Sequence, residues 1–306
     1  MNVMLTGSTG FVGSNIYSLL VELSVSVITP VRKEATKQAL SHSILLKDLL
    51  ELDEDLIKRH ATDVFVHCAG LAHNPEADPS RYRDINTDLT VLLAERAASA
   101  GVKRFIFFSS IGVNGSSSQL PFKADDEVTP HDDYTESKFK AEQGLKNIAV
   151  KTGMEVVIIR PPLIYGAGAP GNFAKFVKLA KLPLPKPLGA IHNKRSFVSI
   201  DNLAEFTHLC LTHPNAANET FLVSDGEDLS TSDFLRKISK ALGKPALLLP
   251  VPVSFLRKVG RTVGKEEMID KLAVDLQVDI KKNEELLGWK PSLSVDSALQ
   301  KAFSSL

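Results

Sequence analysis

The chain has 306 residues, and its 36 Lys and Arg balance 36 Asp and Glu, so the formal net charge is zero. This length is enough to bury one large core or two coupled lobes. Because the sequence holds neither a basic block nor an acidic tail, recruitment of nucleic acid by bulk charge is excluded. The sequence shows no signal segment of charged and then apolar residues and no run of about 18 apolar residues. It therefore predicts a cytoplasmic protein with no membrane insertion.

Short β-branched runs alternate with helical patterns through the first two thirds of the chain. The expected strands are Val3–Thr6, Val25–Thr29, Ser43–Leu46, Val64–Cys68, Phe105–Ser109 and Glu155–Arg160. Helices are expected to begin near Phe11, Ile85 and Tyr134. Since continuous apolar strands indicate burial on both faces, the sequence predicts an α/β fold of Rossmann type, with a doubly wound parallel sheet.

After Arg160 the sequence becomes rich in Gly and Pro, and a second lobe begins. The proline-rich segment Leu182–Gly189 is expected to be extended. A strand and three helices follow, at Thr220–Ser224, Asp201–Leu211, Ser232–Leu242 and Ser254–Ala273. We therefore expect a cofactor domain over residues 1–165 and a smaller C-terminal α/β substrate lobe over residues 166–306. The boundary is expected to be interleaved, with the Arg195–Ser224 region packing on the Rossmann sheet.

One helical stretch of the second lobe, Val251–Lys265, combines apolar side chains with Arg257, Lys258 and Arg261. Basic helices that lie on membrane surfaces show this pattern. Ordinary helices whose charges face water show it too, and the sequence favours that second interpretation.

Three glycines spaced three apart, Gly7, Gly10 and Gly13, join the first strand to the first helix. Glycine permits the turn and lets a pyrophosphate approach the amides at the helix N-terminus, where the dipole favours negative charge. Gly7 is expected to make the turn, Gly10 to admit the phosphates and Gly13 to let the helix pack closely. Phe11 and Val12 lie between Gly10 and Gly13 and are expected to contact the same ligand. A glycine-rich surface turn has the same pattern, so the interpretation depends on the rest of the chain.

Tyr134 and Lys138 are four residues apart at the start of a helical stretch and therefore share one face. An ammonium beside a phenol lowers the phenol's pKa, as a general acid or base requires. Two exposed helix residues without a function have the same spacing. However, Ser109 and Ser110 end a strand at the carboxyl edge, where doubly wound sheets bind ligands, so Ser110 is expected to hold the substrate oxygen that Tyr134 protonates or deprotonates.

These features together resemble an extended short-chain dehydrogenase/reductase of the NAD-dependent epimerase/dehydratase family, and the resemblance spans nearly the whole chain. The segments that carry it are Thr6–Gly13, Asp48-Leu49, His67–Gly70, Asn86, Ser110–Val113, Tyr134–Lys138, Arg160–Gly166, Arg195 and Leu287–Pro291. The resemblance implies an NAD or NADP cofactor. It also implies a nucleotide-sugar substrate.

The resemblance further implies which residues form the site. The catalytic residues would be Ser110, Tyr134 and Lys138. The cofactor contacts would be Gly7, Gly10, Phe11, Val12, Gly13, Arg32, Asp48, Leu49, Ala69, Gly70, Ala72, Tyr134, Lys138 and Pro161. The substrate contacts would be Ser110, Asn172 and Arg195. Arg195 falls where relatives bind the substrate diphosphate, a task that suits a guanidinium because it binds phosphate oxygens bidentately.

The chain departs from the family pattern at three places. Members that prefer NAD place an acid after the second strand, whereas this chain has Arg32 there. Arg32 can attract the 2′-phosphate of NADP, and no carboxylate is present to repel it, so we slightly favour NADP. If Arg32 stacks on the adenine or faces solvent instead, the choice between NAD and NADP stays open. The Asp-Glu pair of 4,6-dehydratases is replaced by Ile111 and Gly112, which disfavours dehydration. Asn114 replaces a frequent tyrosine and leaves one substrate contact in doubt.

The leading hypothesis is an oxidoreductase that acts at C4 of a UDP-hexose or UDP-N-acetylhexosamine, as a 4-epimerase or a 4-ketoreductase. An alternative is an NADPH-dependent reductase of a small non-nucleotide carbonyl, similar to dihydroflavonol reductases, but such a substrate has no use for Arg195. A non-catalytic dinucleotide sensor is a third hypothesis, which Ser110, Tyr134 and Lys138 together disfavour. Scattered histidines without ligand spacing imply no metal. A homodimer is expected through helices such as Ile85–Ala100.

Overall fold

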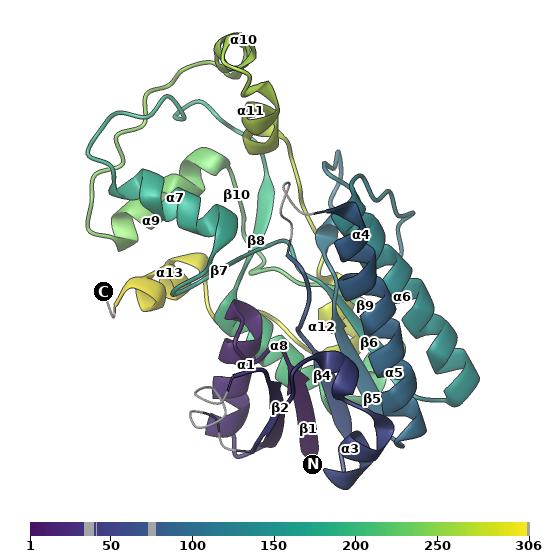
Figure 1. Ribbon diagram of the computed structural model, residues 1–306. Coiled ribbons are helices and arrows are strands. Elements are labelled where there is room, and N and C mark those ends of the chain that lie inside the picture. The colour runs from purple at the N-terminus through teal and green to yellow at the C-terminus, as the bar shows by residue number, and fades with distance from the viewer. Residues whose placement is uncertain (34–39, 41, 73–77, 305–306) are drawn as a thin grey trace.

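A computed structural model of the protein describes residues 1–33, 40, 42–72 and 78–304. Its centre is a seven-stranded parallel sheet in which the strand order reverses beside β1 (Figure 1). In spatial order the strands are β3 (Ser43–Leu45), β2 (Ser26–Val31), β1 (Asn2–Thr6), β4 (Val64–His67), β5 (Arg104–Phe108), β6 (Glu155–Arg160) and β9 (Thr220–Leu222). The predicted Rossmann-type parallel sheet is confirmed, and most strand ends differ from the predicted ones by one or two residues.

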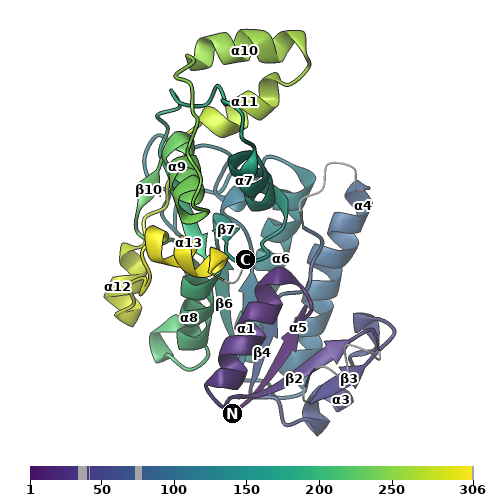
Figure 2. The same cartoon turned by 90° about the vertical axis from the view of Figure 1, so that its left-hand side faces the viewer.

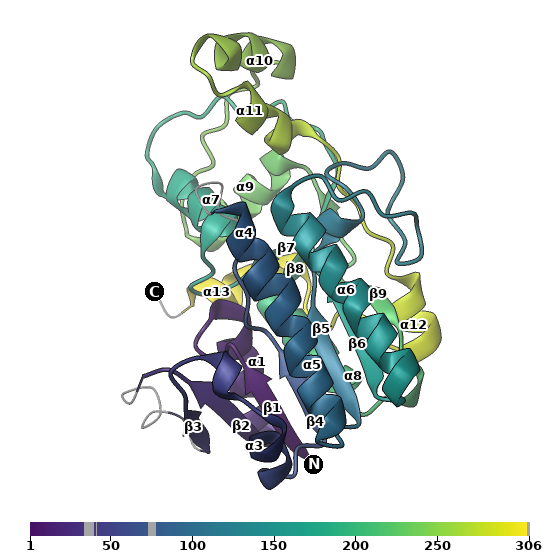
Figure 3. The ribbon, with the colours of Figure 1, turned by 45° about the vertical axis from the view of Figure 1, so that its right-hand side comes forward.

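Helices cover both faces of this sheet, because alternate strand residues point into two separate cores. Along β1, Val3 and Leu5 enter one core and Met4 enters the other. The first core lies beneath α1 (Phe11–Glu22) and α8 (Ile200–Cys210), and the second beneath α3 (Glu54–Arg59), α5 (Leu89–Ser99) and α6 (Asp133–Thr152). Figure 3 shows α5 and α6 side by side over the second face. This double burial explains why the strands are apolar on both sides.

The smaller lobe is built on a three-stranded sheet and an aromatic core. Its strands are β7 (Leu163–Tyr165), β8 (Arg195–Ser199) and β10 (Asp228–Leu229), and its helices are α7 (Gly171–Lys181), α9 (Thr231–Ala241) and α13 (Val295–Phe303). The rings of Phe197 and Phe234 stack there with centroids 4.0 Å apart. Figure 2 shows this lobe above the large sheet.

The chain passes between the lobes several times. After β8 it returns to the large sheet through α8 and β9. Near the end, α12 (Lys281–Leu287) and the buried Trp289 join the core beneath α1 and α8, where Trp289 packs edge-on against Phe206. The two lobes therefore share segments rather than one hinge.

Two predicted helices differ from the structure. The single helix expected over Ser254–Ala273 is wrong: α10 (Val253–Thr262) and α11 (Glu266–Ala273) are separate, because Gly264 adopts a left-handed φ of +68° that ends the first helix. The helix expected near Ile85 begins earlier, with α4 (Pro79–Tyr82) and a π-helical turn at Arg83–Asp88 ahead of α5. Among the described residues, no helix is both long and apolar enough to span a membrane.

Candidate active site at the carboxyl edge of the sheet

The glycine turn after β1 is sterically restricted to glycine at two of its three positions. Gly7 has a φ of +72°, and a Cβ there would lie 2.6 Å from the amide nitrogen of Ala69. A Cβ on Gly13 would lie 2.2 Å from the carbonyl oxygen of Gly7, so α1 packs directly on the turn. Inside the turn, the buried hydroxyl of Ser8 has no hydrogen-bond partner within the described chain. An unpaired buried hydroxyl in a glycine cradle suits a phosphate group.

The segment after β4 is held against α6 by the buried Asn86. The Asn86 side chain accepts a hydrogen bond from the Leu71 amide at 2.8 Å and donates to the Leu71 carbonyl at 3.1 Å. It also donates to Ser137 Oγ at 3.1 Å, which ties this segment to α6. A Cβ on Gly70 would lie 3.4 Å from the Lys138 ammonium. The π-helical turn that carries Asn86 is a feature frequent at functional sites.

The structure brings the three predicted catalytic residues together. α6 begins with a capping box between Asp132 and Thr135, which fixes Tyr134 in the first turn. Tyr134 is hydrogen-bonded to Ser110, and Ser110 Oγ accepts the Gly112 amide at 3.1 Å. One turn further along α6, Lys138 Nζ donates to the Phe108 carbonyl at 2.9 Å and lies 4.6 Å from the centre of the Phe107 ring.

Burial dominates the electrostatics of this group. It raises the pKa of Tyr134 to about 12, against the opposing hydrogen bond from Ser110. Burial also lowers the pKa of Lys138 to about 8, with Cys68 and Glu142 opposing that shift. Lys138 is not among the groups that shift the pKa of Tyr134 in this arrangement, because its ammonium is directed at the Phe108 carbonyl, so the predicted effect of Lys138 on the phenol stays a prediction. Tyr134 is a neutral phenol at pH 7, in the form that donates a proton.

A buried ion pair beneath these residues is absent from the sequence-based expectations. Glu142 Oε1 accepts from Arg160 Nε at 2.8 Å, and Glu142 Oε2 accepts from Arg160 Nη2 at 2.5 Å, with both side chains almost fully buried. Ser109 Oγ donates to the same carboxylate at 2.5 Å, and Arg160 Nη1 donates to Asn114 Oδ1 at 2.9 Å. The network joins α6, the ends of β5 and β6, and the loop that holds Asn114. Its one sequence signal is that Glu142 lies one turn beyond Lys138.

The buried His67 at the end of β4 is a structural residue. One ring nitrogen lies 2.8 Å from Thr6 Oγ1 and the other 3.1 Å from Thr90 Oγ1. Desolvation, aided by the Lys138 charge, lowers the pKa of His67 to about 3. The imidazole is therefore neutral at physiological pH.

The remaining predicted cofactor contacts occupy the same edge of the sheet or its borders. Arg32 directly follows β2 and is exposed, without a hydrogen bond or ion pair to any other described residue. Asp48 caps the short helix Leu49–Glu51 by accepting the Leu50 amide at 2.9 Å. The Pro161 carbonyl accepts the Ile111 amide at 3.1 Å, which joins the segment after β6 to the one after Ser110.

The two predicted substrate contacts of the second lobe sit on different elements, β8 and α7, and have different partners. Arg195 begins β8, and its guanidinium donates to the Lys271 carbonyl of α11 at 2.5 Å. Burial lowers the pKa of this guanidinium, with Asp275 opposing the shift. Asn172 is exposed at the start of α7 and accepts a hydrogen bond from Lys175 at 3.4 Å.

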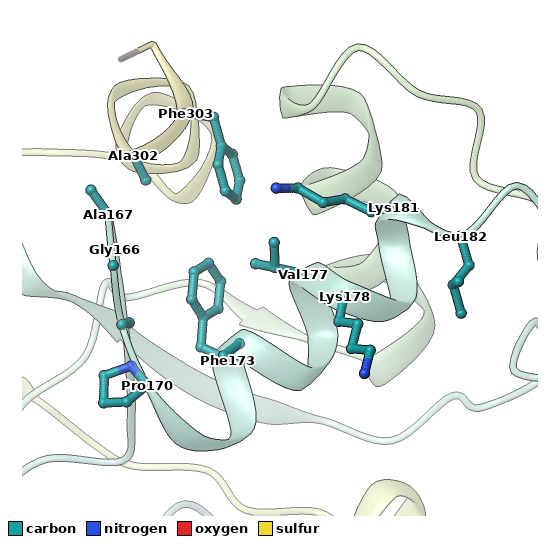
Figure 4. A pocket seen from close by; sticks show the side chains of 13 residues that line it. Gly166, Ala167, Pro170, Phe173, Val177, Lys178, Lys181, Leu182, Ala302 and Phe303 are labelled. Atoms are coloured by element: carbon teal, nitrogen blue, oxygen red, sulfur yellow. The ribbon is translucent and has the colours of Figure 1, made fainter. Parts of the chain in front are cut away.

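A cavity of about 630 Å³ lies beside α7, between the loop at residues 166–170 and α13. Figure 4 shows Phe173 and Phe303 facing one another across it, with Lys181 directed toward Phe303. Asn172 and the three predicted catalytic residues do not line it. The cavity is thus distinct from the group of predicted catalytic residues. Within the described residues, no cluster of three or more His, Cys, Asp or Glu is placed to hold a metal ion.

Comparisons with known proteins agree with this architecture. The profile of the NAD dependent epimerase/dehydratase family matches residues 3–224. A UDP-glucose 4-epimerase from Vibrio cholerae is 43% identical over 297 residues, which cover 95% of this chain and 90% of that protein. A UDP-N-acetylglucosamine 4-epimerase from Bacillus cereus has a TM-score of 0.81 at 20% identity, covering 99% of this chain and 98% of that one. A UDP-glucuronic acid 4-epimerase from Bacillus cereus in complex with NAD has a TM-score of 0.79 at 21% identity, with 99% and 98% covered.

Proposed function

The chain belongs to the NAD dependent epimerase/dehydratase family, and from this premise we propose that it is a 4-epimerase of a UDP-hexose or UDP-N-acetylhexosamine. The observation that carries the proposal is the hydrogen-bonded pair of Ser110 and Tyr134, with Lys138 one turn away at the carboxyl edge of the sheet. As a member of the family it is an NAD-dependent enzyme. The sugar, the proton transfer and the residue roles below are parts of the proposal.

The proposed cofactor site runs across the carboxyl edge of the sheet. The restricted glycines and the unpaired Ser8 hydroxyl fit a pyrophosphate at the start of α1. The complete proposed set is Gly7, Gly10, Phe11, Val12, Gly13, Arg32, Asp48, Leu49, Ala69, Gly70, Ala72, Tyr134, Lys138 and Pro161. A nicotinamide dinucleotide bound there supplies a hydride acceptor and donor.

The residues at the end of β5 and the start of α6 would handle the proton of the sugar hydroxyl at C4. Ser110 holds the oxygen, and Tyr134 accepts the proton when the alcohol is oxidised and returns it when the ketone is reduced. The ammonium of Lys138 lies one helical turn from Tyr134 and donates to the Phe108 carbonyl, with 2.9 Å between Lys138 Nζ and that oxygen. A positive charge there favours the phenolate form of Tyr134 and so opposes the effect of burial.

The substrate proposal rests on Arg195 and on sequence similarity. A guanidinium freed from its contact with the Lys271 carbonyl can bind two diphosphate oxygens at once, and no carboxylate forms an ion pair with Arg195 among the described residues. The relative from Vibrio cholerae, 43% identical, is named a UDP-glucose 4-epimerase. Asn172 is proposed as a further substrate contact. The exposed faces of α5 and α6 are the proposed homodimer surface.

A second candidate is a 4-ketoreductase that uses NADP at the same site. Arg32 is exposed at the end of β2, and residues 29–33 include no acid to repel a 2′-phosphate. We expect the Arg32→Asp variant to shift cofactor preference toward NAD by about tenfold, since a carboxylate binds two ribose hydroxyls. Dissociation constants of NAD and NADP for both proteins measure this shift. An unchanged ratio would show that Arg32 does not reach the ribose.

Native mass spectrometry and turnover assays separate the candidates. Purified protein that retains NAD and interconverts UDP-hexoses or UDP-N-acetylhexosamines is an epimerase. Protein that is isolated without cofactor, binds NADPH and reduces a 4-keto sugar nucleotide is a reductase. Absence of binding to UDP and to any UDP-sugar at millimolar concentration would contradict the nucleotide-sugar proposal and favour a reductase of small carbonyls.

A further inference from the structure

Helix α10 presents an apolar stripe to solvent. Phe255, Val259 and Val263 follow one another along one side of the helix and its end, and they are 57%, 44% and 59% exposed. The adjoining side holds Leu256 and Gly260, which are buried, and a Cβ on Gly260 would lie 3.2 Å from Ile269 of α11. The helix is therefore fixed to α11 by one side while its apolar stripe has no cover from the described chain.

The stripe lies at the extreme end of the substrate lobe. Figures 1, 2 and 3 all show α10 as the outermost element, on the side of α11 away from the large sheet. Nearby in sequence, Leu247, Leu249 and Met268 are also 40–50% exposed. Scattered exposed apolar residues need no explanation, but Phe255, Val259 and Val263 lie together along one side of a protruding helix, which indicates an interaction surface.

The charges of α10 identify the chemistry of the partner. The helix carries Arg257, Lys258 and Arg261 and no acidic residue. Arg257 pairs with Asp270 and Arg261 pairs with Glu266, and both acids belong to α11. Lys258 and the following Lys265 are exposed, with no ion pair in the described structure. On α10 and the turn after it, the two charges that form no ion pair are therefore both cations.

We propose that α10 docks reversibly on anionic phospholipid surfaces. Phe255, Val259 and Val263 would enter the boundary between headgroups and acyl chains, while Lys258 and Lys265 face lipid phosphates, without any segment crossing the bilayer. A second copy of this chain fits less well, because pairing the same stripe around a two-fold axis brings its cations together. The proposal replaces the interpretation of Val251–Lys265 as a helix that turns only its charges to water.

Docking at α10 would also place the substrate lobe against the membrane. α11 packs on α10 and accepts the Arg195 guanidinium through the Lys271 carbonyl. If α10 bound a membrane, only α10 and α11 would lie between the lipid phosphates and Arg195, the proposed diphosphate contact. Membrane binding itself does not depend on the proposed catalytic function.

Vesicle flotation of the full-length protein tests the proposal. We expect wild-type protein to float with vesicles of phosphatidylcholine and phosphatidylglycerol, to remain unbound with phosphatidylcholine alone, and to be released by salt. The F255S/V259S double variant should lose at least about tenfold in apparent affinity, because two apolar contacts are removed. The K258Q/K265Q variant should bind more weakly by several-fold. Leu120→Ser, which removes a 79% exposed apolar residue elsewhere, is the matched control and should bind like wild type.

Three outcomes would overturn the proposal: no flotation of wild type with anionic vesicles, equal flotation of the F255S/V259S variant, or a wild-type oligomer that this variant dissociates in light scattering. Circular dichroism of each variant confirms that the fold is retained. Turnover of a soluble UDP-hexose without vesicles should be the same in wild type and the F255S/V259S variant. This last assay reports on the proposed catalytic function separately from membrane binding.

Discussion

The carboxyl edge of the large sheet and the outer end of the smaller lobe are built in opposite ways. At the sheet edge, Asn86, Glu142 and Arg160 are buried and hydrogen-bonded to two or more elements each. At the outer end, α10 lacks a side-chain N-cap and exposes a run of apolar residues. The first region keeps polar groups fixed inside the protein, whereas the second offers apolar groups to something outside it.

This difference separates the region of the proposed chemistry from the region of the proposed recognition. Proton transfer requires groups held in one geometry, and the buried hydrogen bonds beneath α6 would hold the proposed catalytic residues in that geometry. The proposed recognition at Arg195 would instead use a guanidinium that donates to a backbone carbonyl and forms no ion pair with a carboxylate among the described residues. Substitutions at the sheet edge should therefore affect turnover or folding. Substitutions in the smaller lobe should affect ligand binding, with little effect on folding.

The largest expected effect is at Tyr134. Tyr134→Phe should lower turnover by at least about a thousandfold, because it removes the oxygen that exchanges the substrate proton. Cofactor binding should stay within a few-fold, since the ring and its edge contact with Tyr82 remain. Steady-state kinetics and cofactor titration measure both, with Tyr82→Phe as the matched control that keeps Ser110, Tyr134 and Lys138. Full activity of the Tyr134→Phe protein would reject the assignment.

Breaking the buried ion pair should cost the most stability. Glu142→Gln leaves the Arg160 guanidinium buried without its counter-charge, and removing one partner of such a pair destabilises a protein by about 3–5 kcal/mol. Glu136→Gln breaks the exposed pair with Lys140 on the same helix and should cost less than about 1 kcal/mol. Urea unfolding of both variants gives the comparison. Equal losses would show that the network does not fix α6.

Arg195→Ala should weaken binding of UDP and UDP-hexose by about a hundredfold, because it removes a charge-assisted bidentate contact. Folding and cofactor affinity should change little, as expected for the smaller lobe. Calorimetric titration with UDP measures the loss. Arg236→Ala, at an exposed arginine paired with Asp233, serves as control, and a similar loss there would mean that Arg195 has no specific role.

A smaller effect concerns pH and His67. Its folded-state pKa of about 3 lies below the ordinary value of 6.5, so the unfolded chain binds the proton first as pH falls. Stability present above pH 6.5 is then lost toward pH 3, at up to about 1.4 kcal/mol per pH unit. Between pH 7 and pH 5, wild type should lose about 2 kcal/mol more than His67→Gln in denaturant unfolding. Parallel losses would show that His67 is not the acid-sensitive group.

The parts of the site that can be predicted from the sequence are those that short motifs determine. The turn at Gly7, the strand end at Ser110 and the pair of Tyr134 and Lys138 each depend on residues within one turn or one strand. Local spacing determines such features, and the structure brings Ser110, Tyr134 and Lys138 together at the expected edge.

The parts that do not follow are long-range or conformational. Glu142 pairs with Arg160 from another element, and no local pattern indicates which acid a buried arginine selects. The direction of the Lys138 ammonium depends on the Phe108 carbonyl, and sequence spacing alone does not indicate the burial that raises the pKa of Tyr134. The break between α10 and α11 depends on one residue, Gly264. A glycine within an otherwise periodic stretch is also compatible with a continuous helix, so the sequence alone does not predict the break.

Isotope tracing tests the central claim most directly. Purified protein is incubated with UDP-galactose or UDP-N-acetylgalactosamine deuterated at C4, and the product is analysed by mass spectrometry and NMR. We predict that wild type forms the gluco epimer with deuterium retained at C4, and that Tyr134→Phe forms it at least about a thousandfold more slowly. Loss of the deuterium to solvent, or equal conversion by the Tyr134→Phe protein, would contradict the proposed hydride and proton transfer at this site.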